Sequence, residues 1–195
     1  MILIDPDLDP DSRPPSKAAS PLTAKGSRPR PWRERLPTPR TLERFLRKAQ
    51  GAIRLRGEVT VLFTTDREIR RLNREFRSKN KATDVLSFPA DQFVQKFEQT
   101  AGDLAISVDT ARKQSAEQGH ALTCELQVLI LHGLLHLAGY DHETDSGEMA
   151  RWERRLRARF GLSQGLIERS RPGRRSREKV RAKTIGTAGR NAGAR

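Results

Sequence analysis

Three of the four histidines in this chain lie close together, at His132, His136 and His142. On a helix, His132 and His136 fall on the same face, one turn apart. Gly139 follows them, and glycine often ends a helix because it enters the left-handed backbone region without strain. His142 then lies on a loop that can fold back over the helix. We predict that the three imidazoles hold one metal ion and leave a coordination position open, as in catalytic zinc sites.

The residues around the first two histidines indicate a buried helix. Between Leu126 and Leu137, only Gln127 and the two histidines are polar. A helix this apolar packs inside a domain, where an imidazole without a partner is costly. The alternative is that both histidines are hydrogen-bonded core residues. The spacing of all three histidines favours one Zn²⁺ ion, although imidazoles also bind nickel, cobalt and copper.

The histidine spacing is also similar to the zinc protease pattern His-Glu-x-x-His-x-x-Gly-x-x-His. In those proteases the residue after the first histidine is the glutamate that acts as general base. Here that position is Gly133, which has no side chain. The pattern therefore keeps the metal ligands and disfavours peptidase activity.

The composition limits the class of protein. At 195 residues, the chain is long enough for one domain with a substantial core. No apolar stretch approaches the ~20 residues that span a bilayer, and the N-terminus has no secretory pattern. The single cysteine, Cys124, permits no intrachain disulfide and is expected to pack in the core rather than bind metal. We expect a cytoplasmic protein with no membrane partner. Neither a P-loop nor a dinucleotide-binding glycine pattern occurs, so no nucleotide cofactor is expected.

The two ends of the chain differ from its middle. Residues 1–37 are rich in proline and are expected to be largely disordered, although residues 2–5 could add an edge strand to a sheet. Residues 163–195 carry most of the net charge of +14, with ten Lys or Arg against Glu168 and Glu178. This basic tail is also expected to be disordered. It either attracts RNA by counterion release or only keeps the protein soluble. The folded domain is predicted to span residues 38–162.

Helices and strands interleave in that domain without a strict βαβ order. Hydrophobic periodicity predicts helices over about 39–52, 109–118, 122–138 and 146–160, and a further helix capped by Asp66 with Ile69, Leu72 and Phe76 on its buried face. Strands are predicted at 58–65, 83–89 and 102–108, with a loop at 90–101. This order predicts an α+β fold with a small mixed β-sheet packed against helices in a single domain.

Three segments together are similar to the YbeY family of bacterial endoribonucleases. The first is Leu-Asn-Arg-Glu-Phe-Arg at 72–77, continuing to Thr-Asp-Val-Leu-Ser-Phe-Pro at 83–89. The second is Gly-Asp-Leu-Ala-Ile-Ser at 102–107, and the third runs from 132 to 142. The similarity covers roughly residues 38–161 with the motifs in order. The Pro-rich N-terminal segment and the basic tail depart from the family pattern.

The resemblance implies a zincin-like domain with a zinc ion on His132, His136 and His142. It implies cleavage of single-stranded RNA in the maturation of rRNA, at the 3′ end of 16S rRNA, with the ribosome or ribosomal proteins as partners. It also implies that Arg77 lines the active cleft, so that Arg77 and His132 are the expected catalytic residues. Zinc activates water at neutral pH without a protein base, and an arginine fork can hold the charge that develops on a phosphodiester. The alternative for Arg77 is a solvated charge on an arginine-rich helix face.

Other polar residues have open assignments. Asp84 and Asp103 either orient the imidazoles or cap a loop or strand end. Asp141 and Glu143 flank His142 and are candidate proton shuttles, although Glu143 could instead help to start the last helix. Ser87 either contacts substrate or packs.

His120 is expected to be exposed.

Two alternatives to an endoribonuclease remain: a metallopeptidase-like hydrolase, and a noncatalytic ribosome-assembly factor whose metal is structural.

Overall fold

The computed structural model describes residues 1–8, 35–91, 97–142 and 144–162. These residues form one α+β domain with a four-stranded sheet, which confirms the predicted fold class. Most of the Pro-rich segment, at 9–34, and the basic tail lie outside the described residues. Their predicted disorder therefore stays a prediction.

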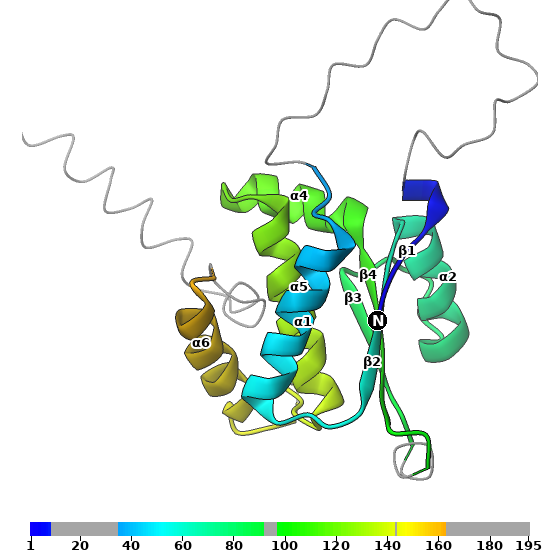
Figure 1. Ribbon diagram of the computed structural model, residues 1–195. Helices are drawn as coiled ribbons and strands as arrows, with labels where there is room; N and C mark the ends of the chain where they lie inside the picture. The colour runs from blue at the N-terminus through cyan, green and yellow to red at the C-terminus, as the bar shows by residue number, and fades with distance from the viewer. Residues whose placement is uncertain (9–34, 92–96, 143, 163–195) are drawn as a thin grey trace, which may run out of the picture.

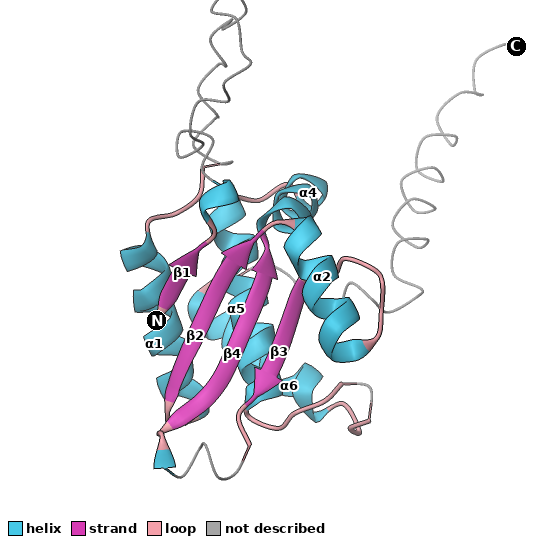
Figure 2. Cartoon of the chain, turned by 90° about the vertical axis from the view of Figure 1, so that its right-hand side faces the viewer, coloured by secondary structure: helices cyan, strands magenta, loops and turns pink. Residues whose placement is uncertain are grey.

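The strands form a mixed sheet in the order β1-β2-β4-β3 (Figure 2). β1 (Ile2–Ile4) pairs in parallel with β2 (Glu58–Thr64), which pairs in parallel with β4 (Thr100–Ser107). β3 (Val85–Pro89) runs antiparallel to β4 and forms the opposite edge of the sheet from β1. β3 also contacts the helix that carries His132 and His136, so this edge borders the histidines.

The helices cover the two faces of the sheet unequally (Figure 1). Among the described residues, four α-helices lie on one face of the sheet and α2 (Asp66–Arg77) lies on the other. The four are α1 (Pro39–Ile53), α4 (Val108–Gln118), α5 (Leu122–Leu137) and α6 (Glu148–Phe160). The chain also makes a short 3-10 turn at Pro6–Leu8.

α5 is the central helix of the domain. Every residue from 128 to 135 is buried, including His132. This helix packs with the inward side chains of the sheet, among them Phe63, Leu104 and Ile106, in one hydrophobic core. The first part of the metal-site prediction, a buried helix, is confirmed.

Two glycines shape the helix that carries the histidines. Gly139 has φ +87°, and its N–H donates to the carbonyl of His136, so the chain leaves the helix where the sequence predicts. Gly133 lies against the sheet. A Cβ atom at Gly133 would come within 2.7 Å of a methyl carbon of Leu104. At the position of the missing protease glutamate the helix therefore packs against the core, and a side chain there would have to displace Leu104.

Replacing Gly133 with alanine should destabilise the domain. The added methyl would crowd buried Leu104, and overpacking a core costs about 1–3 kcal/mol. The higher helix propensity of alanine returns up to about 1 kcal/mol. We expect the free energy of unfolding to fall by about 1–2 kcal/mol, measured by urea denaturation. The exposed Gly51 of α1 meets no atom within 4 Å of its Cβ position, and Gly51→Ala should be neutral or stabilising. Equal effects at the two glycines would contradict the packing argument.

Some predicted boundaries were wrong by one or two residues. β4 begins at Thr100 rather than at 102, because Thr100 pairs with Glu58 across a register shift that the local pattern does not reveal. The N-cap of α2 is Thr65, whose side chain accepts from the N–H of Glu68, and not Asp66. The Asp66 carboxylate instead accepts hydrogen bonds from Ser107 and Thr110 at the start of α4.

Two side chains differ from their predicted exposure. Phe76 lies on the sheet-facing side of α2, but it is 60% exposed, and Asn73 is buried instead. The reason is that Phe76 belongs to the last turn of α2, near the edge strand β3, where little of the sheet remains to cover it. His120 is mostly buried, with Nε2 2.7 Å from the buried carboxylate of Glu125.

No single helix in the described part of the chain has the length and apolar character to cross a membrane. Taken together, α4 and α5 are long and apolar enough for a membrane span by length and composition alone, but they are bent by 115° at the break between them.

Candidate metal centre

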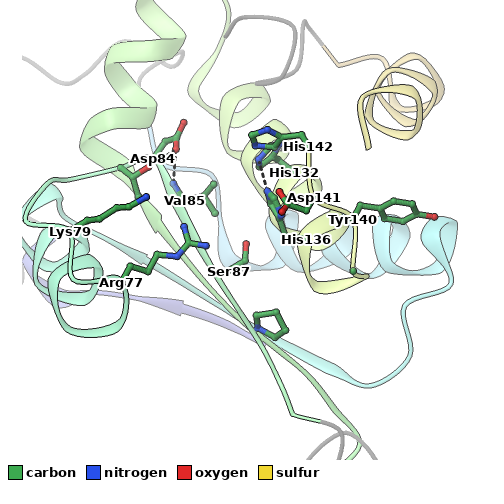
Figure 3. Close-up of a pocket in the computed structure, with 13 residues that line it drawn as sticks. Arg77, Lys79, Asp84, Val85, Ser87, His132, His136, Tyr140, Asp141 and His142 are labelled. Carbon is green, nitrogen blue, oxygen red and sulfur yellow. Dashed lines mark hydrogen bonds between the residues drawn. The ribbon is translucent and has the colours of Figure 1, made fainter. Parts of the chain in front are cut away.

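The three histidines converge on one point (Figure 3). Each can offer one ring nitrogen, and the three atoms lie within 4.8 Å of one another. The Nε2 atoms of His132 and His136 are 3.1 Å apart. The ring centroid of His142 is 5.4 Å from each of the other two centroids. The loop after Gly139 thus folds back over α5, as the spacing predicts.

This donor set fits a metal ion. Zinc–imidazole bonds are about 2.0–2.1 Å long, so two nitrogens 3.1 Å apart can both reach one ion. Within the described ranges, no other group of three His, Cys, Asp or Glu side chains is placed to hold a metal. Cys124 is half-buried and does not belong to the group. Three protein ligands would leave a position open for water or substrate.

Glu153 lies behind the first histidine. Its carboxyl oxygen is 3.4 Å from Nδ1 of His132, and its side chain is 1% exposed. Because Nε2 of His132 faces His136, the Nδ1–H is the ring group that can donate to Glu153. A carboxylate in this place fixes the ring orientation and the tautomer, so that the Nε2 lone pair points to the metal position.

Glu153 comes from α6, and Asp145 holds the start of that helix. The Asp145 carboxylate accepts the N–H groups of Gly147, Glu148 and Met149 at 2.7–3.1 Å. These backbone hydrogen bonds, that of Met149 foremost, keep the pKa of Asp145 below its usual value. The bonds satisfy donors that α6 itself leaves open and anchor the helix next to the histidine loop.

The environment keeps His136 neutral. Burial, together with the rings of His132 and His142, lowers the pKa of His136 from 6.5 to about 4, against smaller opposing effects of Asp141 and the backbone of Tyr140. A neutral imidazole is the form that binds a metal. The site is therefore ready to bind a cation at neutral pH without first losing a proton from this ring.

The lowered pKa of His136 predicts a pH-dependent stability of the metal-free protein. Between about pH 6.5 and pH 4 the unfolded chain binds a proton at His136 that the folded protein excludes. The free energy of unfolding should therefore fall as the pH drops through this window and lose nothing further from this group below it. Urea denaturation of chelator-treated protein at several pH values measures this change. His136→Asn should show a smaller fall, and an equal fall in both proteins would contradict the assignment.

A cavity of about 450 Å³ opens beside the histidines. Arg77 and Lys79 lie on the far side of this cavity from the three rings, and Ser87 lies between the two groups (Figure 3). Arg77 is the last residue of α2, and β3 follows after a short loop. Asn73 holds this loop, since its side-chain amide donates to the carbonyl of Lys81 at 2.7 Å.

Arg77 differs from the other arginines of its helix. Arg71 pairs with Glu68 and Glu75 on the helix surface, and Arg70 donates to Asn80. Arg77 instead lines the cavity and has no ion pair or side-chain hydrogen bond within the described residues. It is therefore not one more charge of the surface arginine group.

Neither of the two aspartates considered as possible orienting residues has a hydrogen bond to an imidazole among the described residues. Asp84 lines the cavity, but its carboxylate accepts from the N–H of Val85, from Thr83 and from Gln114. These bonds fit the alternative prediction of a cap at the start of a strand. Asp103 is exposed on β4, where Leu104, the next residue, points into the core. The acceptor for His132 is Glu153.

The remaining candidates are only partly located. Ser87 and Asp141 both line the cavity, and Asp141 accepts a hydrogen bond from Thr144. Glu143 lies outside the described residues, so its role as a shuttle or helix-start residue stays a prediction.

Sequence reasoning missed Glu153, although a signal was present. The last helix buries Met149, Ala150 and Leu156 on one side, and Glu153 falls among them at helical spacing. A carboxylate on the apolar side of a helix needs a polar partner. Only the fold shows that this partner is a histidine 21 residues earlier.

Removing the carboxylate charge of Glu153 should weaken metal binding. We expect Glu153→Gln to lower Zn²⁺ affinity by about 10- to 100-fold, because the Nδ1–H of His132 would then donate to a neutral amide oxygen instead of a carboxylate. Competition with a chromophoric chelator measures the affinity without relying on activity. Asp103→Asn removes an exposed carboxylate and should bind zinc like the wild type. An unchanged affinity in Glu153→Gln would show that Glu153 does not act on the site.

The sequence is similar to proteins of one named family. The family model described as Endoribonuclease YbeY matches residues 36–161. A protein named Endoribonuclease YbeY from Koribacter versatilis is 52% identical over 130 residues, which cover 67% of this chain and 82% of the relative. A relative of the same name from Solibacter usitatus is 50% identical over 128 residues, with coverage of 66% and 83%. The solution structure of TM1509 from Thermotoga maritima is 27% identical and covers 69% of this chain and 90% of that one, with a TM-score of 0.45.

The matched segment contains the sheet strands β2, β3 and β4, all five α-helices of the described domain and the three histidines. It covers well over half of the chain. The chain therefore belongs to the Endoribonuclease YbeY family.

Proposed function

We propose that this chain is a zinc-dependent endoribonuclease that cuts single-stranded RNA in the maturation of rRNA, at the 3′ end of 16S rRNA. The observation that carries the proposal is the cluster of three imidazoles, which opens into a cavity whose far side is cationic. Family membership supports RNA as the substrate class. The proposal includes the ribosome or ribosomal proteins as partners and the cytoplasm as the place of action.

His132, His136 and His142 would hold the zinc ion, which supplies Lewis-acid activation at neutral pH. The fold holds these ligands in place. α5 carries two of them on one face, the loop after Gly139 brings the third, and Glu153 orients the ring of His132. Such preorganisation lowers the cost of assembling the site during the reaction.

Arg77 and Lys79 would bind the phosphodiester. Both line the cavity and neither side chain has an ion pair among the described residues, so neither must give up a protein partner to bind a phosphate. Negative charge grows on the phosphoryl oxygens during cleavage, and a planar guanidinium can hold two of them at once. Arg77 and His132 are the catalytic residues in this proposal.

The cavity also bears on the two alternatives. A purely structural metal is enclosed by its ligands and needs no open space beside it. This site borders a cavity of about 450 Å³. A peptidase of the zinc protease type needs a glutamate at position 133, and Gly133 packs there against Leu104. Both observations support RNA cleavage over the alternatives.

The experiment that tests this function uses the purified full chain. Protein treated with chelator and protein reloaded with one equivalent of Zn²⁺ are incubated with a single-stranded RNA, with the same RNA annealed to its complement, and with unfolded casein. We expect zinc-dependent internal cuts in the single-stranded RNA alone. Zinc-dependent proteolysis without RNA cleavage would overturn the proposal in favour of a peptidase. Zinc binding without any cleavage would favour the noncatalytic assembly factor.

A further inference from the structure

Phe76 is a large apolar side chain that the fold leaves open. It lies in the last turn of α2, on the side that faces the sheet, yet it is 60% exposed. Its ring makes an edge contact with Phe88 of β3, with ring centroids 5.2 Å apart and an interplanar angle of 69°. Because Phe88 is half-buried in the small core under α2, it holds the orientation of the exposed ring. Phe76 therefore presents an aromatic surface to solvent in a fixed place.

Three cationic residues without a protein partner among the described residues lie within three residues of Phe76 in the sequence. Arg74, Arg77 and Lys79 make no ion pair or side-chain hydrogen bond within the described part of the chain. The other arginines of α2 are engaged: Arg67 with Asp7, Arg70 with Asn80, and Arg71 with Glu68 and Glu75. The two arginines of α2 that make no such contact, Arg74 and Arg77, thus both lie at its C-terminal end, within two residues of Phe76.

The exposed ring lies near the metal cavity, on the other side of the edge strand β3. Arg77, the next residue after Phe76, lines that cavity, and neighbouring Cα atoms are only about 3.8 Å apart. Phe88 lies between Ser87 and Pro89, which also line the cavity. Side chains alternate along a strand, so Phe88 faces α2 while its two neighbours face the histidines. The edge strand β3 therefore separates the aromatic pair from the metal cavity by the thickness of one strand.

We propose that Phe76 stacks an unpaired base of single-stranded RNA next to the phosphate held at Arg77, across the edge strand β3 from the metal centre. This inference rests on the proposed endoribonuclease function and adds a base-binding position to it. Exposed aromatic rings beside cationic grooves bind single strands in this way, since every base has a face to stack and the cations hold the backbone. A base inside a duplex is already stacked on both faces, so this contact favours single-stranded substrate.

The test compares full-length Phe76→Ala, Phe76→Leu and Phe76→Trp with the wild type. Fluorescence anisotropy gives the Kd for single-stranded RNA in the presence of chelator, and cleavage by zinc-loaded protein gives kcat/KM. We expect Phe76→Ala and Phe76→Leu to weaken binding by about 5- to 100-fold, whereas Phe76→Trp restores it. Leucine keeps an apolar contact with Phe88 but has no flat ring. Phe97→Ala removes an equally exposed phenylalanine elsewhere and should bind RNA like the wild type.

A series of RNAs with one abasic nucleotide at successive positions identifies the stacked base. One position should weaken binding to the wild type and have no further effect in Phe76→Ala, an outcome that general loss of structure does not produce. Wild-type affinity in Phe76→Leu, or the same abasic profile in both proteins, would overturn the inference; a protein partner would then be the better occupant for Phe76. If the wild type binds RNA through Phe76 but never cuts it, the base-binding position stands and the proposed nuclease function fails.

Discussion

Replacing His136 with alanine should abolish both stoichiometric zinc binding and RNA cleavage, while the domain stays folded. Loss of an orienting residue typically costs 10- to 100-fold in metal affinity, and loss of a ligand should cost more than about 100-fold. Only two imidazoles, His132 and His142, would then remain. Elemental analysis of the dialysed protein should give about one zinc per wild-type chain and almost none per variant chain.

The fold should tolerate this change for two reasons. His136 lies near the C-terminal end of α5, whose packing depends on the apolar residues before it, and alanine is the best helix former. The metal-free variant should therefore unfold within a few degrees of the metal-free wild type. His120→Gln serves as a histidine control for zinc content, since His120 pairs with Glu125 outside the site. A variant that loses zinc and cannot fold would favour a structural metal.

Much of this site could be predicted from sequence because it is local. His132, His136 and Gly139 are related by the period of one helix and its end, and His142 is three residues further on. The helical repeat alone places the first two rings on one face. The structure adds the closure of the loop, which brings a ring nitrogen of His142 within 4.8 Å of those of the other two histidines.

The parts that the sequence did not predict depend on distant pairings. Glu153 reaches His132 only because α6 packs on α5, and the exposure of Phe76 depends on where the sheet ends. Periodicity predicts that Phe76 faces inward, and the same helical period puts the missed Glu153 on the buried side of α6. It cannot show what lies opposite, because that is decided by the order of the strands and the packing of the helices.

Arg77 lies on the other side of the cavity from the three histidines. We expect Arg77→Ala to lower kcat/KM for single-stranded RNA by about 10²- to 10³-fold, the usual cost of removing one group that stabilises transition-state charge. Zinc content should stay at one per chain, because Arg77 does not belong to the ligand group. Arg77→Lys keeps the charge but not the planar fork, so it should recover only part of the activity.

Arg71→Ala is the matched control for Arg77. Arg71 is on the same helix with the same charge, but it pairs with Glu68 and Glu75 on the surface and does not line the cavity. If the arginine only attracts RNA by its charge, both variants should lose activity to a similar degree. The difference from the wild type should then become smaller at high salt. A specific role in the reaction predicts a large loss of kcat in Arg77→Ala alone, at any salt concentration. Unchanged cleavage by zinc-loaded Arg77→Ala would contradict the catalytic assignment, since the guanidinium would then be an exposed charge that happens to border the cavity.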